Sequence, residues 1–181
     1  MAISASNKKF KFGLAVMRCQ PYHLGHERLI EKMIGECEDC IVVLGTIQEW
    51  RTKKNPLTFE ERKKLILNTH PRLRVLGIPD LGHPELWGEY VLKLVEEYFI
   101  KNNEKPKKAD TYYVGSQYDA QWLEGHIGHI VNINRNDAHY PFISGSMLRD
   151  MLTFKDDRWK DYINPKNRKL VKELLYGKSF K

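Results

Sequence analysis

The stretch FKFGLAVMRCQPYHLGH runs from Phe10 to His26. Its first part, Phe10–Met17, is short and mostly apolar, which predicts a buried strand. Apolar residues then recur at helical spacing, among them Leu29, Ile30 and Met33, which predicts a helix over residues 24–35. The chain therefore turns from a strand into a helix at the tetrapeptide that begins at His23.

The same alternation continues along the chain. We expect strands at residues 40–45, 73–78, 111–115 and 130–133. Thr58 with Glu61 three residues on forms a capping box, and apolar residues from Trp87 to Phe99 repeat every three or four positions. Helices are expected at both places and again after Ser144. This order predicts an α/β fold with a doubly wound parallel sheet.

Length and composition fit one domain. The chain has 181 residues, 41% hydrophobic and 29% charged, which is enough for a real core. We expect a single domain over residues 1–181, with a core at about 10–150 and a helical tail at about 151–181. No apolar run reaches the length of about 18 residues of a spanning helix, and residues 1–9 lack an apolar signal core, so we expect a cytoplasmic protein without a membrane partner.

The cysteines and the net charge carry less information. Cys37 and Cys40 form a C-x-x-C without the second pair that a zinc site needs, so we interpret them as small apolar residues. The net charge is +7, and the basic residues are scattered apart from residues 101–108 and the end of the chain after Lys166. Positive potential suits a polyphosphate site and a nucleic-acid surface equally well, so charge alone does not decide between them.

The position of His23-Leu24-Gly25-His26 indicates chemistry. The N-terminus of a helix offers free backbone N–H groups and a partial positive charge, and it binds phosphate readily. Gly25 allows the backbone to approach a ligand, and the two imidazoles add directional donors. A second His-x-Gly-His, from His126 to His129, precedes an expected strand instead of a helix, and it therefore lacks this anion-binding setting.

A second turn near the end of the chain matches the first. Residues 143–149 read ISGSMLR, in which Ser144 is a good helix N-cap. Arg149 lies near Ser144 along the expected helix, and a guanidinium can hold a polyphosphate with two donors at once. Ligands in doubly wound folds lie beyond the carboxyl ends of the strands, where both turns belong.

Together, the two turns resemble the paired signatures of the nucleotidylyltransferases. Class I aminoacyl-tRNA synthetases share the first signature but carry a lysine-rich second motif that is absent here. The segments at residues 45–51, 55–62, 78–80 and 158–165, with Trp87 and Val91, are similar to those of archaeal-type nicotinamide-nucleotide adenylyltransferases. The sequence departs from that family at Met17 and Cys19, where Gly and Phe are usual, and at Ser146, where Thr is common.

The resemblance implies a Rossmann-like nucleotidyltransferase fold and transfer of AMP from ATP to nicotinamide mononucleotide (NMN), giving NAD and diphosphate. It implies Mg²⁺ carried by the ATP phosphates without protein ligands, no nucleic-acid partner and a homo-oligomer. The expected catalytic residues are His23, His26 and Arg149. The expected ATP- and phosphate-binding residues are Arg18, Gln20, Gly25, Gly115, Asp119, Ser144, Gly145 and Ser146. The expected substrate-binding residues are Trp50, Arg51, Asn55, Asp80 and Trp87.

Two alternatives stay open at this level. A related nucleotidyltransferase, such as a pantetheine-phosphate adenylyltransferase or a glycerol-phosphate cytidylyltransferase, would use the same phosphate machinery. A basic RNA-binding protein would instead use the lysine-rich tail, and its binding would depend steeply on salt.

Overall fold

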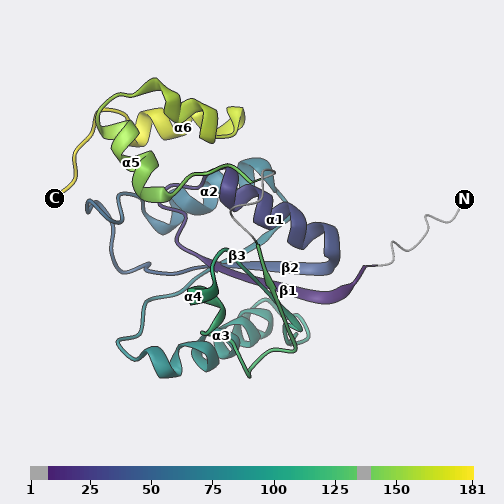
Figure 1. The fold of residues 1–181 in the computed structure, drawn as a ribbon. Coiled ribbons are helices and arrows are strands. Elements are labelled where there is room, and N and C mark those ends of the chain that lie inside the picture. Colours follow the sequence, from purple (N-terminus) through teal and green to yellow (C-terminus); the bar gives the residue numbers. More distant parts are fainter. Residues whose placement is uncertain (1–7, 134–139) are drawn as a thin grey trace, which may run out of the picture.

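Five parallel strands form one sheet in the order β3-β2-β1-β4-β5 (Figure 1). The computed structural model describes residues 8–133 and 140–181. The strands are β1 (Phe10–Met17), β2 (Cys37–Leu44), β3 (Arg74–Gly77), β4 (Thr111–Val114) and β5 (His129–Asn132). The first strand lies in the middle, paired with β2 on one side and β4 on the other. The predicted doubly wound parallel sheet is confirmed.

The helices are α1 (Leu24–Glu36), α2 (Phe59–Thr69), α3 (Trp87–Lys101), α4 (Gln117–Ala120), α5 (Gly145–Thr153) and α6 (Pro165–Leu175). Two 3₁₀ helices, Pro84–Leu86 and Asp157–Tyr162, precede α3 and α6. In Figure 1, α1 and α2 lie on one face of the sheet and α3 and α4 on the other, with α5 and α6 packed beyond the first pair. The helical character predicted for the end of the chain is confirmed.

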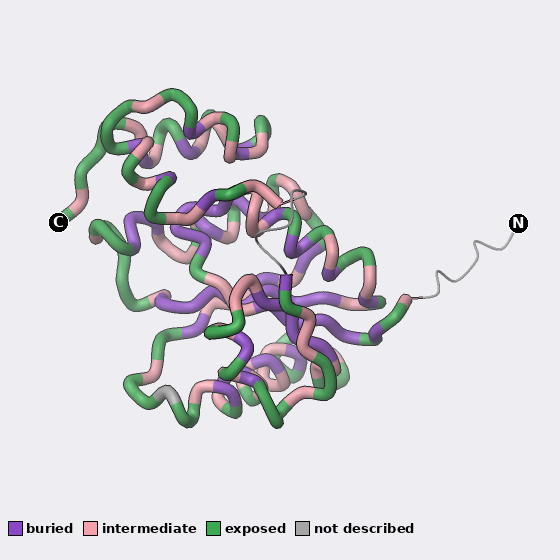
Figure 2. Tube along the Cα trace, viewed as in Figure 1, coloured by how far each residue is buried: buried purple, intermediate pink, exposed green. Residues whose placement is uncertain are grey.

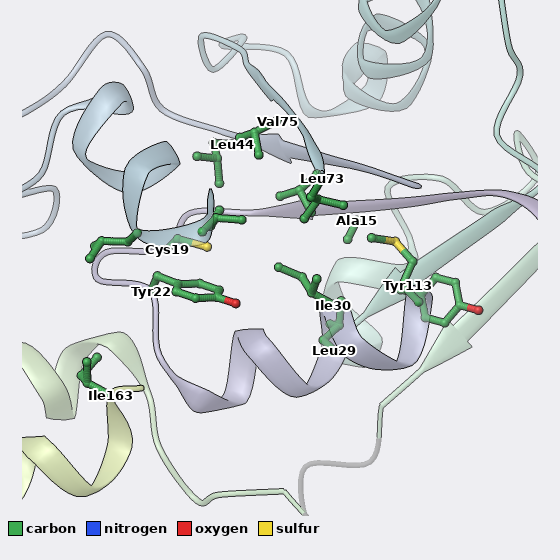
Figure 3. Packing of buried hydrophobic residues seen from close by; sticks show 14 of the residues in the cluster. Ala15, Cys19, Tyr22, Leu29, Ile30, Leu44, Leu73, Val75, Tyr113 and Ile163 are labelled. Carbon is green, nitrogen blue, oxygen red and sulfur yellow. The ribbon is translucent and has the colours of Figure 1, made fainter. Parts of the chain in front are cut away.

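Each face of the sheet has its own core. Neighbouring residues of β2 point to opposite faces, so that Val42 belongs to one apolar cluster and Val43 to the other. Figure 3 shows the first cluster, in which Ile30 of α1 packs against the sheet beside Ala15 and Tyr22. The three inner strands, β1, β2 and β4, are buried along most of their length (Figure 2), whereas the outer strands β3 and β5 are mostly partly exposed.

Local patterns placed most element ends correctly. The capping box of α2 is present, with the Glu61 N–H donating to Thr58 Oγ1 at 3.2 Å and the Thr58 N–H donating to Glu61 Oε2 at 2.8 Å. The second strand begins at Cys37, three residues before the predicted start. The charged Asp39 interrupts the apolar run from which the start of the strand was predicted. Arg74 and Lys107 bind the Asp39 carboxylate, so this charge is tolerated in the strand.

The cysteines behave as buried apolar residues. Cys37 and Cys40 lie at the start of β2 as free thiols, and burial raises the pKa of Cys40 to about 12. No cluster of three or more His, Cys, Asp or Glu side chains that would hold a metal ion occurs in residues 8–133 and 140–181. None of the helices in the same part of the chain is long and apolar enough to cross a membrane.

Candidate active site

A cavity of about 610 Å³ lies beyond the carboxyl ends of the strands. Its walls come from the segments that follow β1, β2, β3 and β4 and from the start of α5, as expected for a doubly wound fold. The volume is in the range of small-molecule sites. The residues of the predicted site that line it are Arg18, His23, Gly25, His26, Asp80, Trp87, Gly115, Asp119, Ser144 and Gly145.

The two histidines cap the first helix. His23 is the N-cap residue of α1, and its Nδ1 atom accepts a hydrogen bond from the Gly25 N–H at 3.1 Å. His26 Nδ1 accepts from the His23 N–H at 3.4 Å, and the two rings lie 3.8 Å apart between centroids. Because a backbone N–H can only donate, each Nδ1 atom is an acceptor, and the proton of each neutral ring is on Nε2. The cavity therefore has two imidazole N–H donors beside a helix N-terminus.

Gly25 keeps these rings in place. A Cβ atom built on Gly25 would lie 2.9 Å from His23 Cε1 and 3.0 Å from His23 Nδ1. The sequence suggested that this glycine makes room for a ligand. The structure adds that it makes room for the imidazole that caps its own helix.

The second predicted turn meets the first one at a backbone contact. Arg149 of α5 donates from Nη1 to the Gln20 carbonyl at 2.7 Å and from Nη2 to Ser146 Oγ at 3.3 Å. A Cβ on Gly145 would lie 3.1 Å from that same carbonyl, a tight contact that would push α5 and the loop after β1 apart by a few tenths of an ångström. Ser144 is the N-cap of α5, as predicted. Two turns that lie more than 100 residues apart in the sequence thus form one wall.

Arg62 holds the loops that line the site in place, and no pattern in the sequence had marked it as functional. The side chain is fully buried and donates to the carbonyls of Thr58, Arg18, Gly45 and Thr46, at distances of 2.8 to 3.3 Å. It ties the loops after β1 and β2 to the start of α2. Burial lowers its pKa from the ordinary value.

Asp80 has a local partner. Its carboxylate accepts from the Thr46 N–H at 3.1 Å and from the Thr46 hydroxyl. Thr46 has a φ of 56°, a left-handed conformation that this carboxylate holds in place. Asp80 therefore joins the loops after β2 and β3 while it faces the cavity.

Aromatic residues form the opposite wall. Trp87 begins α3 and lines the cavity together with Tyr118 and Trp122, which the sequence did not single out. Tyr118 and Trp122 contact each other edge to face at 5.7 Å. A Cβ on Gly88 would lie 2.2 Å from the Trp122 carbonyl, so only glycine lets this segment approach α3 beside Trp87. Asp119 accepts a hydrogen bond from the Ser116 hydroxyl at the start of α4.

Six residues of the predicted site lie elsewhere. Gln20 is buried and exchanges two hydrogen bonds with the Leu57 backbone, at 2.8 and 2.9 Å. Arg51 pairs with Glu61 of the α2 cap, and Asn55 is buried against Glu49. Trp50 is exposed, and Ser146 and Arg149 line a second cavity. Their predicted roles stay predictions.

The second His-x-Gly-His has a different setting. It ends at His129, the first residue of β5, which lies at the opposite end of the strands from the cavity, whereas His126 lies beside Gly88 of α3, and neither residue lines the cavity. The predicted lack of a following helix is confirmed.

Comparisons with known proteins agree with this geometry. No family model matches the chain. The nicotinamide-nucleotide adenylyltransferase of Aeropyrum pernix is 27% identical over 168 residues, which cover 89% of this chain and 90% of that protein. The enzyme of the same name from Archaeoglobus fulgidus is 23% identical over 169 residues, covering 88% of this chain and 89% of that protein.

Two solved structures share the fold. The bifunctional NMN adenylyltransferase/ADP ribose pyrophosphatase of Francisella tularensis, in complex with AMP and a Mn ion, aligns with a TM-score of 0.63 at 19% identity. The match covers 86% of this chain and 46% of that one. NadR protein in complex with NAD and AMP-PNP aligns with a TM-score of 0.60 at 22% identity, over 89% of this chain and 47% of that one. The chain spans less than half the length of these two larger proteins.

The chain has the nucleotidyltransferase fold, and the two turns that resemble the signatures of that superfamily meet here in one wall. Within that superfamily it is similar, over almost its whole length, to the archaeal-type nicotinamide-nucleotide adenylyltransferases.

Proposed function

We propose that this chain transfers AMP from ATP to nicotinamide mononucleotide, giving NAD and inorganic diphosphate. The observation that carries the proposal is a single cavity with a helix-capped end at His23 and His26, beside the cationic Arg18, and an aromatic end at Trp87. ATP, nicotinamide mononucleotide and NAD each combine charged phosphates with an aromatic ring, which match these two ends of the cavity. Similarity to enzymes with this activity along most of the chain supports the assignment.

In the proposed reaction, a phosphate oxygen of the mononucleotide attacks the α-phosphorus of ATP. The bond from that phosphorus to the oxygen bridging the β-phosphate breaks, and diphosphate leaves with the electron pair. The attacking phosphate is already an anion at neutral pH, so catalysis reduces to alignment and to stabilisation of charge. His23 and His26 donate from Nε2 to phosphate oxygens, together with the N–H groups at the start of α1.

The arginines supply the remaining positive charge. Arg18 lines the cavity at the end of β1, where it binds phosphate in our proposal, as do Gly25, Ser144 and Gly145. Arg149 and Ser146 hold the leaving diphosphate from α5. Arg62 touches only protein groups in the contacts described above, so we assign it a positioning role for the loops that carry Arg18 and Thr46.

A divalent metal ion fits this site as a partner of the nucleotide. Asp80 and Asp119 bring carboxylates to the cavity from two separate loops, and residues 8–133 and 140–181 contain no ready-made cage of three ligands. Magnesium keeps most of its water and binds phosphate oxygens in such sites. When bound to the ATP phosphates, it would neutralise part of their charge.

Specificity is assigned to the aromatic wall. Trp87 stacks on the pyridine ring, and Asp80 accepts a hydrogen bond from the carboxamide or the ribose. Gly115 and Asp119 face the adenosine. Trp50, Arg51 and Asn55 lie outside this cavity, and their proposed part in substrate binding depends on movement of the loop after β2. A cytoplasmic homo-oligomer remains part of the proposal.

The test is incubation of the protein with Mg²⁺, ATP and either nicotinamide or nicotinic acid mononucleotide, followed by product analysis. We expect a dinucleotide and one equivalent of diphosphate. Parallel reactions replace the mononucleotide by pantetheine phosphate, or both substrates by CTP and glycerol phosphate. Diphosphate release in one of those reactions, without dinucleotide formation, would assign the chain to another activity of the superfamily. Salt-sensitive RNA binding without any diphosphate release would remove the enzymatic proposal altogether.

A further inference from the structure

A second cavity, of about 760 Å³, lies beside the first one along α5. Ser144 and Gly145 at the start of this helix line the first cavity, whereas Ser146 and Arg149 line the second. Consecutive residues of the first turn of α5 thus face the two spaces.

The charged lining of the second cavity is mostly cationic. Lys53 and Lys54 come from the loop before α2, Arg149 from α5 and Lys178 from the end of the chain, with Asp150 as the acidic side chain. Three separate segments therefore bring positive charge to one space. Such an arrangement favours a compact, highly charged anion.

The end of the chain is fixed over this cavity. We define residues 177–181 as the tail segment. The Gly177 N–H donates to the Leu152 carbonyl at 2.8 Å, and the Lys53 N–H donates to the Lys181 carbonyl at 3.0 Å. Phe180 packs against the first apolar cluster. Figure 1 shows the C-terminal end of the chain beside the loop that precedes α2. Apolar residues thus anchor the tail segment, and its Lys178 lines the cavity while donating from Nζ to the Glu173 carbonyl at 2.6 Å.

Arg149 connects this cavity to the phosphate end of the first one. Its Nη1 bond to the Gln20 carbonyl fixes the guanidinium against the loop that carries Arg18. Gly145, one turn earlier, would bring a Cβ to within 3.2 Å of Arg149 Nη1. The cation therefore lies at the boundary between the two cavities.

We propose that the second cavity is a binding site for inorganic diphosphate, and that Lys53 and the tail residue Lys178 are its ligands together with Arg149. The proposal rests on the function given above, in which diphosphate is the leaving group. Arg149 and Ser146 belong both to the machinery assigned above and to the lining of this cavity. The tail segment thereby gives the leaving group a place outside the substrate cavity.

The reverse reaction measures this site directly. A diphosphate oxygen attacks the adenylyl phosphorus of NAD, and the bond from that phosphorus to the bridging oxygen breaks, giving ATP and nicotinamide mononucleotide. Loss of one charge-assisted contact should raise the KM for diphosphate roughly tenfold in Lys178→Ala and roughly a hundredfold in Lys53→Ala/Lys178→Ala. The KM for NAD should change less than about twofold.

Lys169→Ala is the matched control, because Lys169 is exposed on α6 and lies outside the lining of both cavities. It removes the same charge and should leave the KM for diphosphate unchanged. An equal rise in Lys169→Ala and Lys178→Ala would mean a general effect of net charge and would overturn the proposal. So would an unchanged KM for diphosphate in the double variant.

Calorimetric titration of sodium diphosphate into the free protein separates this inference from the proposed function. We expect binding that the double variant loses and Lys169→Ala keeps, whether or not dinucleotide is formed. If wild-type protein makes NAD but binds diphosphate no more tightly than the double variant does, the second cavity is not the site and the enzymatic assignment stands.

Discussion

At the scale of single residues, the two histidines of α1 have two tasks. Each Nδ1 atom accepts a backbone N–H, and this fixes the proton of the neutral ring on Nε2. The two rings are tilted by 33°, with centroids 3.8 Å apart, and both line the same end of the cavity. The cap of the helix and the orientation of the proposed catalytic groups are therefore one arrangement of bonds.

Replacing His26 by Ala should lower kcat by roughly 10²- to 10³-fold, because a donor to developing phosphate charge is lost. The accompanying loss of a capping contact should cost about 1 kcal/mol of stability. His129→Ala is the control, since it removes the last residue of the other His-x-Gly-His. Steady-state kinetics and thermal unfolding compare the two, and near-normal turnover of His26→Ala would remove His26 from the mechanism.

At the scale of elements, the first turn of α1 leaves no room for a side chain at Gly25. A Cβ on Gly25 would meet the His23 ring at less than 3 Å, whereas a Cβ on Gly35 of the same helix has nothing within 4 Å among the described residues. The two glycines therefore differ in what they do, although both lie in one helix.

Gly35→Ala should raise the free energy of unfolding by about 0.5–1 kcal/mol, the ordinary gain in a helix. Gly25→Ala should lose that gain and reduce kcat by roughly tenfold or more, because a displacement of the His23 ring misplaces a donor. Denaturant unfolding and kinetics of both variants test this. Equal behaviour of the two would show that Gly25 has no steric role.

Helix α2 is tied to the sheet by Arg62. Four carbonyls from three segments accept its N–H groups in a buried setting. A methionine of similar length would fill the space but leave these carbonyls without a donor, and unsatisfied buried groups are costly.

We therefore expect Arg62→Met to lower the free energy of unfolding by about 2–4 kcal/mol. Arg28→Met is the control, since Arg28 is exposed and pairs only with Glu31 on the surface of α1 in the contacts described. It should change stability by less than about 0.5 kcal/mol. Urea unfolding monitored by tryptophan fluorescence gives both values. An unchanged free energy of unfolding in Arg62→Met would show that the hydrogen bonds of Arg62 contribute little to stability.

At the scale of the whole molecule, the end of the chain packs back on its beginning. Asn164, the N-cap of α6, donates to Glu27 Oε1 of α1 at 2.7 Å, and Asn167 donates to the Leu65 carbonyl of α2 at 2.8 Å. His70 at the end of α2 lies in the same region. Burial lowers the pKa of the His70 imidazole below its ordinary value, the negative charges of Glu27 and Glu31 oppose this shift, and Lys166 adds to it.

The sign of the resulting pH dependence follows from linkage. An unfolded histidine takes up a proton near pH 6.5, whereas folded His70 does so only at lower pH. Between these values the unfolded state binds more protons, so stability falls as the pH drops through this window. Wild type should lose more stability between about pH 7.5 and pH 5.5 than His70→Gln.

His83→Gln is the control for that comparison, since His83 is mostly exposed beside Glu85. Urea unfolding at the two pH values gives the differences. A pH dependence that is the same in wild type, His70→Gln and His83→Gln would show that His70 does not couple protonation to folding.

The sequence alone determined what depends on neighbours within a few positions. Strand and helix periods, the capping box at Thr58 and the caps at His23 and Ser144 are set by hydrogen bonds and burial over three or four residues. The same local signals separated the two His-x-Gly-His stretches, because only one precedes a helix. The family resemblance of the sequence also marked ten residues that line the first cavity.

Only the tertiary structure decided how distant segments approach one another. Arg62, Tyr118 and Trp122 had no local pattern, and their roles depend on the strand order β3-β2-β1-β4-β5 and on the close contact at Gly88. Arg149 and Ser146 turned out to line a second cavity under the end of the chain. Such contacts depend on how elements pack, which a one-dimensional spacing does not encode.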